Sequence, residues 1–131
     1  FGDRNLPPDW LSVVDDLQPA EGFPAEFSYN AVRIPLYLIR AREGDMQLLR
    51  RMRDGMTGEN GGIALVDLES GEVKEELTDA GYRIIPALAS CVLDGTPLPD
   101  DLLGFQPTLY YPSTLHLLAL AHIREAGPEC L

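Results

Sequence analysis

The chain is short of positive charge. Its 131 residues include 10 Lys and Arg against 21 Asp and Glu, a formal net charge of −11, and Lys74 is the only lysine. A surface that binds nucleic acid needs clustered positive charge to contact the phosphates. We therefore expect no nucleic-acid partner, whereas a neutral polysaccharide meets no such objection.

Long apolar runs and common cofactor motifs are also missing. No run reaches the roughly 18 apolar residues that a membrane-spanning helix needs, so we expect no membrane span. The sequence contains no Cys-x-x-Cys, P-loop, Gly-x-Gly-x-x-Gly or Gly-x-Ser-x-Gly pattern. His116 and His122 are spaced i, i+6 on one expected helix, which puts them on different faces. We expect no metal and no cofactor.

Cysteine is scarce as well. The chain has two, Cys91 and Cys130, and two cysteines without a motif do not fix the redox compartment. Cys91 lies in the apolar run 87–93, where we expect its thiol to pack as a small hydrophobic group. Composition is otherwise that of an ordinary globular chain, with 45% hydrophobic and 24% charged residues, and the length suffices for one domain with a core.

The most informative segment that is present covers residues 27–38, Phe-Ser-Tyr-Asn-Ala-Val-Arg-Ile-Pro-Leu-Tyr-Leu. Apolar residues at nearly every position predict a helix that is buried on all sides. Asn30 and Arg33 stand at its head, one turn apart on the same face. Because an unpaired buried polar group is costly, these two side chains either face a ligand cleft or close an internal hydrogen-bond network.

The pattern along the rest of the chain predicts mainly helices. We expect the first helix to begin with Ser28 as its N-cap, to end near 42 and to break or kink at Pro35. A second, amphipathic helix should follow Asp45 to about 54. Its apolar stripe would contain Met46, Leu49, Met52 and Met56.

Short strands and two further helices complete the prediction. Residues 10–14 read as a short strand, and 63–74 as a hairpin. Thr78 is the expected N-cap of another helix that is apolar on all sides, and Ser113 that of a last helix, which Gly127-Pro128 ends. Between them, 95–107 is a Pro-rich connection with one short turn. These apolar helices cannot all be buried in a chain of this size, so we expect exposed apolar surface.

Residues 28–35, Ser-Tyr-Asn-Ala-Val-Arg-Ile-Pro, resemble the Ser-Tyr-Asp-Ala-x-Arg signature of glycoside hydrolase family 8. That family holds bacterial endoglucanases, chitosanases and xylanases. Four other segments resemble family motifs in the same order along the chain. They are residues 8–11, 66–71, 80–88 and 110–115.

The resemblance implies a mainly α fold, a partial (α/α)6 toroid with short β-hairpins. The family toroid has six inner and six outer helices, for which this chain is too short. Residues 1–131 would correspond to the C-terminal third, a C-terminal fragment of a family 8 catalytic domain. The family's general acid is a Glu near the start of that domain, and no segment here matches it. The remainder of the same catalytic domain is therefore an expected partner.

The resemblance also implies a function: endo-acting hydrolysis of a β-1,4-glucan with inversion, in a secreted or periplasmic enzyme. Inversion needs one carboxyl group to protonate the leaving oxygen and a second, roughly 6.5–9.5 Å away, to activate water. With the acid absent, the fragment alone should be inactive. The alternative is a non-catalytic helical protein that binds a glycan or a partner and retains the toroid helices.

The signature departs from the family at Asn30, where family members commonly carry the Asp that acts as base. An amide is not a useful general base at neutral pH. Three explanations stay open. In the first, a nearby Glu supplies the base, with Glu26 and Glu21 as local candidates. In the second, the protein is a weak or inactive relative that still holds glycan. In the third, the Asn is an engineered substitution.

Arg33 and three tyrosines complete the expected site. Arg33 would hold the amide or carboxylate cluster, bond sugar hydroxyls, or form a purely structural salt bridge. Tyr29, Tyr110 and Tyr111 are candidates to line the sugar cleft, because flat aromatic faces stack on pyranose rings.

Three other aromatic residues are expected to be structural. We interpret Tyr37 and Tyr82 as core residues. Trp10 is expected to be a core anchor, with a sugar-stacking surface as the alternative.

Overall fold

The computed structural model describes residues 1–42 and 44–131. The chain is mainly helical, with 47% helix and 13% strand. Its helical elements are η1 (Ala31–Arg33), α1 (Ile34–Ala41), α2 (Met46–Met56), α3 (Ala80–Asp94), α4 (Asp100–Leu103), α5 (Tyr110–Ala126) and η2 (Pro128–Cys130). Its strands are β1 (Leu11–Ser12), β2 (Gln18–Pro19), β3 (Glu26–Phe27), β4 (Ile63–Asp67) and β5 (Val73–Leu77). Within the described residues, no helix has the length and apolar character to cross a membrane.

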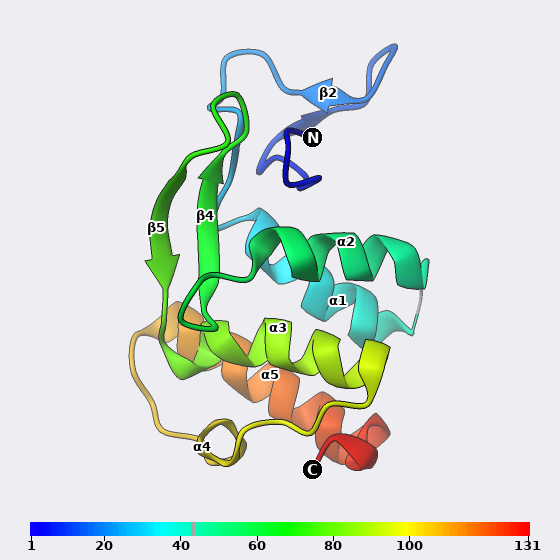
Figure 1. Ribbon diagram of the computed structural model, residues 1–131, viewed down its shortest axis with the longest axis vertical. Helices are drawn as coiled ribbons and strands as arrows, with labels where there is room; N and C mark the ends of the chain where they lie inside the picture. The colour runs from blue at the N-terminus through cyan, green and yellow to red at the C-terminus, as the bar shows by residue number, and fades with distance from the viewer. Residues whose placement is uncertain (43) are drawn as a thin grey trace.

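Helix α3 is the centre of the helical layer. It packs against α5 on one side and against α2 and α1 on the other, as Figure 1 shows. The antiparallel sheet β3-β4-β5 flanks these helices, and β1 pairs with β2 in a separate hairpin at the end of the molecule opposite the C-terminus. The fully buried side chains of the core include Phe27, Leu36, Met52, Ile63, Ile84, Ile85, Leu88 and Leu115.

Several predicted elements are confirmed. Asp45 caps α2, its Oδ1 accepting a hydrogen bond from the Gln47 amide at 2.8 Å. The hairpin is β4–β5, with Ile63 paired to Leu77. The short turn in the Pro-rich connection is α4, and α5 ends before Gly127.

The start of the first helix differs from the prediction. The segment opens with one turn of 3-10 helix, η1, and α1 begins only at Ile34. Pro35 therefore occupies the first turn of α1, where its missing N–H costs nothing, and it marks the break between the two helix types. The side chain of Ser28 does not cap either helix, so that prediction was wrong.

Two other helix caps were placed incorrectly. Asp79, not Thr78, is the N-cap of α3. Helix α5 begins at Tyr110, so Ser113 lies within it, where its hydroxyl accepts a hydrogen bond from the Thr108 amide at 2.8 Å.

Three side chains expected to be buried are exposed. Trp10 is 50% exposed, Tyr37 46% and Met46 56%, so the core assignments of the two aromatic residues and the place of Met46 on the packed stripe were wrong. Tyr82 is buried as expected. The buried stripe of α2 consists instead of Leu49, Met52, Gly55 and Met56.

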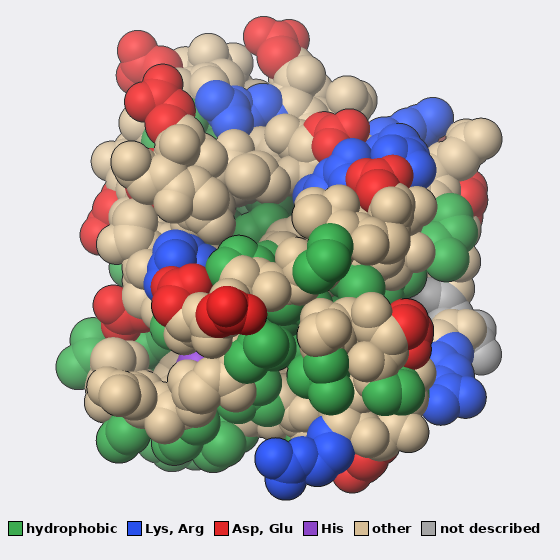
Figure 2. Space-filling model, turned by 60° about the horizontal axis from the view of Figure 1, so that its bottom comes forward, with side chains coloured by type: hydrophobic (Ala, Val, Ile, Leu, Met, Phe, Trp, Pro, Cys, Tyr) green, Lys and Arg blue, Asp and Glu red, His purple; other side chains and the backbone are tan. Residues whose placement is uncertain are grey.

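The predicted exposed apolar surface is confirmed. Figure 2 brings the lower end of Figure 1 forward and shows hydrophobic side chains gathered on its surface. On the first turns of α5, Leu109, Tyr110 and Leu117 are all at least half exposed. Exposed apolar faces of this kind occur at contact surfaces for proteins, membranes or ligands.

The two cysteines form a disulfide, Cys91–Cys130, which joins α3 to the C-terminal η2. The expectation that Cys91 packs only as a small hydrophobic group was therefore incomplete. The bond closes a loop with a sequence separation of 39 residues, and such a cross-link stabilises a fold mainly by restricting the unfolded chain.

We predict that Cys130→Ser lowers the free energy of unfolding by about 2–4 kcal/mol, measured by urea denaturation without reductant. Reduction of the unmodified chain should reproduce the same shift, and reductant should leave the variant unchanged. Equal urea midpoints for the variant and the oxidised parent would contradict a native disulfide.

Candidate functional site

The carboxylate of Asp9 organises the head of the segment that carries Asn30. Its Oδ1 accepts hydrogen bonds from the Ser28 amide at 2.8 Å and the Ala31 amide at 2.9 Å, and its Oδ2 accepts one from the Asn30 amide at 3.3 Å. These amides lead into η1, a position where a negative charge is favoured, and the Ala31 amide also donates to the Ser28 carbonyl at 3.1 Å. Asp9 therefore fixes the backbone on both sides of Tyr29.

The side chains at this tip face outward. Asn30 is exposed and Tyr29 is 47% exposed, whereas Ala31 and Val32, the next two residues, are buried. The apolar residues anchor the turn in the core, and the polar residues before it remain accessible. The tip is thus not sealed inside the molecule.

Arg33 lies beside the ring of Tyr37, with its guanidinium carbon 5.9 Å from the ring centroid. Among the described residues it makes no ion pair, so the structural salt bridge considered for it is not present there. A guanidinium held over an aromatic face keeps its N–H donors free, and these donors can reach hydroxyl or carboxylate oxygens.

Tyr111 connects α5 to this tip. Its hydroxyl donates a hydrogen bond to the backbone carbonyl of Tyr29 at 2.5 Å, and its ring lies 6.1 Å from that of Tyr82 in a tilted arrangement. The close crossing of α3 and α5 permits this contact. A Cβ on Gly81 would lie 1.8 Å from the Pro112 carbonyl oxygen, so only glycine fits there.

The neighbouring Tyr110 is the most exposed large aromatic residue recorded here, at 87%. Tyr29, Asn30, Arg33 and Tyr111 are therefore brought together around one tip, and Tyr110 extends from its edge.

The electrostatics of the tyrosines reflect this clustering. Burial raises the pKa of Tyr82 to about 12, with smaller contributions from the charges of Tyr29, Tyr111, Asp79 and Glu75. Burial also raises the pKa of Tyr111, while the nearby Arg33 charge lowers it. Both phenols therefore stay protonated at neutral pH, and Tyr111 keeps the proton that it donates to Tyr29.

Glu26, the carboxylate considered as an alternative base, faces another partner. It lies on β3, and its Oε2 accepts a 2.8 Å hydrogen bond within an ion pair with Lys74 of β5. Within the described parts of the chain, no hydrogen bond or ion pair joins its side chain to Asn30 or Arg33.

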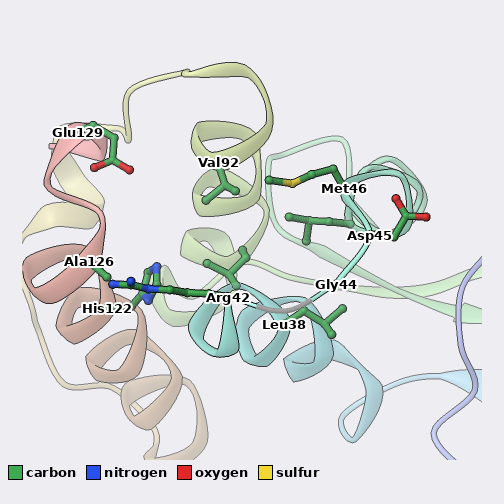
Figure 3. A pocket seen from close by; sticks show the side chains of 11 residues that line it. Leu38, Arg42, Gly44, Asp45, Met46, Val92, His122, Ala126 and Glu129 are labelled. Atoms are coloured by element: carbon green, nitrogen blue, oxygen red, sulfur yellow. The ribbon is translucent and has the colours of Figure 1, made fainter.

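A cavity of about 390 Å³ lies away from these residues. It is bordered by the end of α1, the start of α2, and the C-terminal parts of α3 and α5 (Figure 3). Arg42 reaches across it toward His122. Burial and the charges of Arg40 and Arg42 lower the pKa of His122, so its ring is neutral at pH 7. None of the predicted site residues lines this cavity.

Sequence reasoning missed Asp9. In the sequence, residues 8–11 were used only as one of the segments that resemble the family. The hydrogen bonds of Asp9 join positions 19 to 22 residues apart, and contacts at that separation leave no periodic signal in the sequence. The sequence offered no local signal for Asp9, because Ser28 stood at the helix start as a competent N-cap.

Comparisons with known proteins identify relatives of this chain. It is 36% identical, over 90% of its length, to a probable endoglucanase of Novacetimonas hansenii. Its fold matches an endo-β-1,4-glucanase of Acetobacter xylinum with a TM-score of 0.69 and 32% identity over the whole chain. It also matches a family 8 glycosyl hydrolase of Klebsiella pneumoniae, an endoglucanase, with a TM-score of 0.66 and 26% identity over 95% of the chain. No family model matches.

The fold and the shared sequence are similar to part of these enzymes, and the helices are arranged as in a portion of their (α/α)6 barrel. More specifically, the chain is a relative of the family 8 glycoside hydrolases and matches a C-terminal portion of them. It spans 35% of the Novacetimonas protein and 40% and 39% of the two solved chains. The resemblance stated from residues 28–35 and the predicted partial toroid are confirmed.

We predict that Asp9→Ala lowers the free energy of unfolding by about 1–2 kcal/mol, because the helix N-terminus loses its acceptor. Chemical denaturation measures this loss. Asp16→Ala is the matched control, since Asp16 is exposed and its side chain makes no hydrogen bond within the described residues. Equal losses for the two variants would show that Asp9 is not a cap.

We also predict a pH dependence from Tyr82. Its pKa is raised in the folded state, so its contribution to stability is complete below pH 10 and is lost as the pH rises from 10 toward 12. Tyr82→Phe should reduce this alkaline loss by about 1–2 kcal/mol. Tyr110→Phe is the control, because its ring is exposed. Identical alkaline profiles for Tyr82→Phe and the parent chain would contradict the prediction.

Proposed function

We propose that this chain is part of an endo-acting glycoside hydrolase that cleaves β-1,4-glucan with inversion. The observation that supports this most directly is the exposed tip, where Asp9 and Tyr111 hold the backbone at Tyr29 and Asn30 and where Arg33 follows in the same turn. The relatives' names describe endoglucanases, and the tip carries the signature that resembles theirs. Polysaccharide is the substrate class.

The proposed roles follow from the geometry. Tyr29 and Tyr110 offer exposed rings to the apolar faces of sugar rings, and Tyr111 contributes through its hydrogen bond to the Tyr29 backbone. Arg33 donates hydrogen bonds to substrate hydroxyls or to a reacting carboxylate. Asn30 occupies the base position, and its amide orients water without being able to take a proton from it.

Glu26 is the local carboxylate proposed to serve as base. It would first have to leave Lys74. A partly exposed ion pair of this kind contributes only about 0–1 kcal/mol, so the separation is energetically accessible. The general acid, in this proposal, belongs to residues outside these 131, and the chain alone does not hydrolyse glucan.

The proposed partner of the exposed apolar surface on α5 is the remainder of the same catalytic domain. The chain spans 35–40% of its relatives, and Leu109 and Leu117 present exposed apolar area that further toroid helices would bury. Residues 1–131 would then be the C-terminal part of that domain.

A secreted or periplasmic location is proposed as well. Disulfides persist in oxidising compartments and are rare in the reducing cytosol of mesophiles. The Cys91–Cys130 bond supports such a compartment.

The alternative is a non-catalytic protein that binds glycan through the same tip. Asn30 favours it, because an amide in place of the family's carboxylate preserves hydrogen bonding to sugar while removing the base. Hydrolysis by the longest protein that contains this chain, lost in Glu26→Gln, would support the enzyme over this alternative.

We predict that cellohexaose binds the chain and that Tyr110→Ala weakens this binding about 2- to 10-fold, as expected for the loss of one stacking ring. Isothermal titration calorimetry gives the dissociation constants. The matched control is Leu117→Ala, which removes exposed apolar area from the same helix without removing an aromatic ring. No heat of binding at millimolar sugar, or equal affinities for both variants, would contradict the proposed cleft.

A further inference from the structure

The β1–β2 hairpin carries an exposed aromatic pair that the proposed catalytic cleft does not use. The rings of Trp10 and Phe23 are stacked, with centroids 4.7 Å apart and an interplanar angle of 25°. Phe23, like Trp10, is about half exposed. The hairpin lies at the end of the molecule opposite the C-terminus (Figure 1).

Backbone hydrogen bonds, not burial, hold this pair in place. The Trp10 carbonyl accepts from the Ala20 amide at 2.8 Å, and the Ala20 carbonyl accepts from the Phe23 amide at 3.3 Å. On the other side of Trp10, the Asp9 amide donates to the Glu26 carbonyl at 2.8 Å. The two rings are therefore presented by a fixed backbone, which lowers the entropy lost when a ligand stacks on them.

Phe23 also borders a hollow of about 340 Å³, which polar residues line as well. Its other lining residues include Gln18 and Glu21 from the hairpin and Glu69 from the β4–β5 turn. The size lies within the range of small-ligand sites. An aromatic face bordered by one amide and two carboxylates matches a pyranose ring, whose C–H face is apolar and whose edge carries hydroxyl donors.

The chemistry of the hollow argues against an anion or a metal ion as its ligand. Glu21 and Glu69 would repel an anion at neutral pH. The described residues contain no group of three or more His, Cys, Asp or Glu side chains placed to hold a metal ion. An uncharged polyol with one apolar face satisfies both the carboxylates and the ring.

We propose that this hollow is a second binding site for a β-1,4-linked glucan chain, separate from the tip at Asn30. Phe23 is the stacking ring, Trp10 supports it from behind, and Gln18, Glu21 and Glu69 bind hydroxyl groups. The site rests on the proposed function for the identity of its ligand and extends it, because a second site would hold the polymer while another segment occupies the cleft.

Trp10 is the only tryptophan of the chain, so selectively excited tryptophan emission reports on this hairpin alone. Titration with cellohexaose should change the Trp10 emission saturably. Phe23→Ala should remove the change or weaken the apparent affinity at least fivefold, whereas Phe23→Tyr, which keeps a ring, should retain it. Val14→Ala is the matched control, since Val14 is exposed on the same hairpin and does not border the hollow. Circular dichroism verifies that every variant is folded.

The outcomes separate this site from the cleft. Calorimetry could show cellohexaose binding that Tyr110→Ala weakens while the Trp10 emission does not change. That result would overturn the second site and leave the proposed function standing. A Trp10 response that depends on Phe23, without Tyr110-dependent binding, would support the second site and contradict the cleft. A response to glucosamine hexamer alone, abolished by salt, would overturn the proposal, because it would reveal only attraction to the two carboxylates.

Discussion

The structure depends on one carboxylate at the start of a helix. Asp9 accepts three backbone hydrogen bonds from residues 28–31 and joins the N-terminal arm to the segment that enters the core. Without this carboxylate the Ser28 and Asn30 amides would lose their acceptor, whereas the Ala31 amide would keep its bond to the Ser28 carbonyl. The positions of Tyr29 and Asn30, and hence the geometry of the candidate site, follow from this contact.

A second constraint acts on the same tip from the opposite end of the chain. The hydroxyl of Tyr111 donates to the carbonyl of Tyr29, so one residue is held through the amides on both sides of it and through its own carbonyl. The contact needs the close approach of α3 and α5 that Gly81 allows. Residues far apart in sequence thus fix the backbone of the exposed Tyr29 and Asn30. A binding site requires rigid support of this kind.

Local patterns predicted much of the helical framework. The stripe of α2 with its Asp45 cap, the β4–β5 hairpin, α4 and the end of α5 at Gly127 all follow from periodicity, caps and turn residues. The signature at 28–35 predicted the family, which the comparisons confirm. These features depend on neighbours within a few positions, and the sequence displays them directly.

Long-range contacts could not be predicted in this way. The Asp9 cap, the Cys91–Cys130 disulfide and the pairing of Glu26 with Lys74 each join residues that only the tertiary fold brings together. Trp10 and Tyr37 were assigned to the core from their residue type, yet Trp10 is held by a hairpin that projects from the body. Tyr37 lies on a face of α1 that no described element covers. Whether an aromatic residue is buried depends on the residues that the tertiary fold places around it. Those residues lie elsewhere in the sequence, so the local sequence does not reveal them.

The central claim is that the tip held by Asp9 and Tyr111 binds carbohydrate. The most direct test is the two-dimensional ¹H–¹⁵N spectrum of the labelled chain during titration with cellohexaose. The account predicts saturable shifts of the amide signals of residues 29–33 and of Tyr110 and Tyr111, with Val92 and Ala126 at the distant cavity unaffected. Shifts confined to that cavity, or an unchanged spectrum at millimolar sugar, would contradict it.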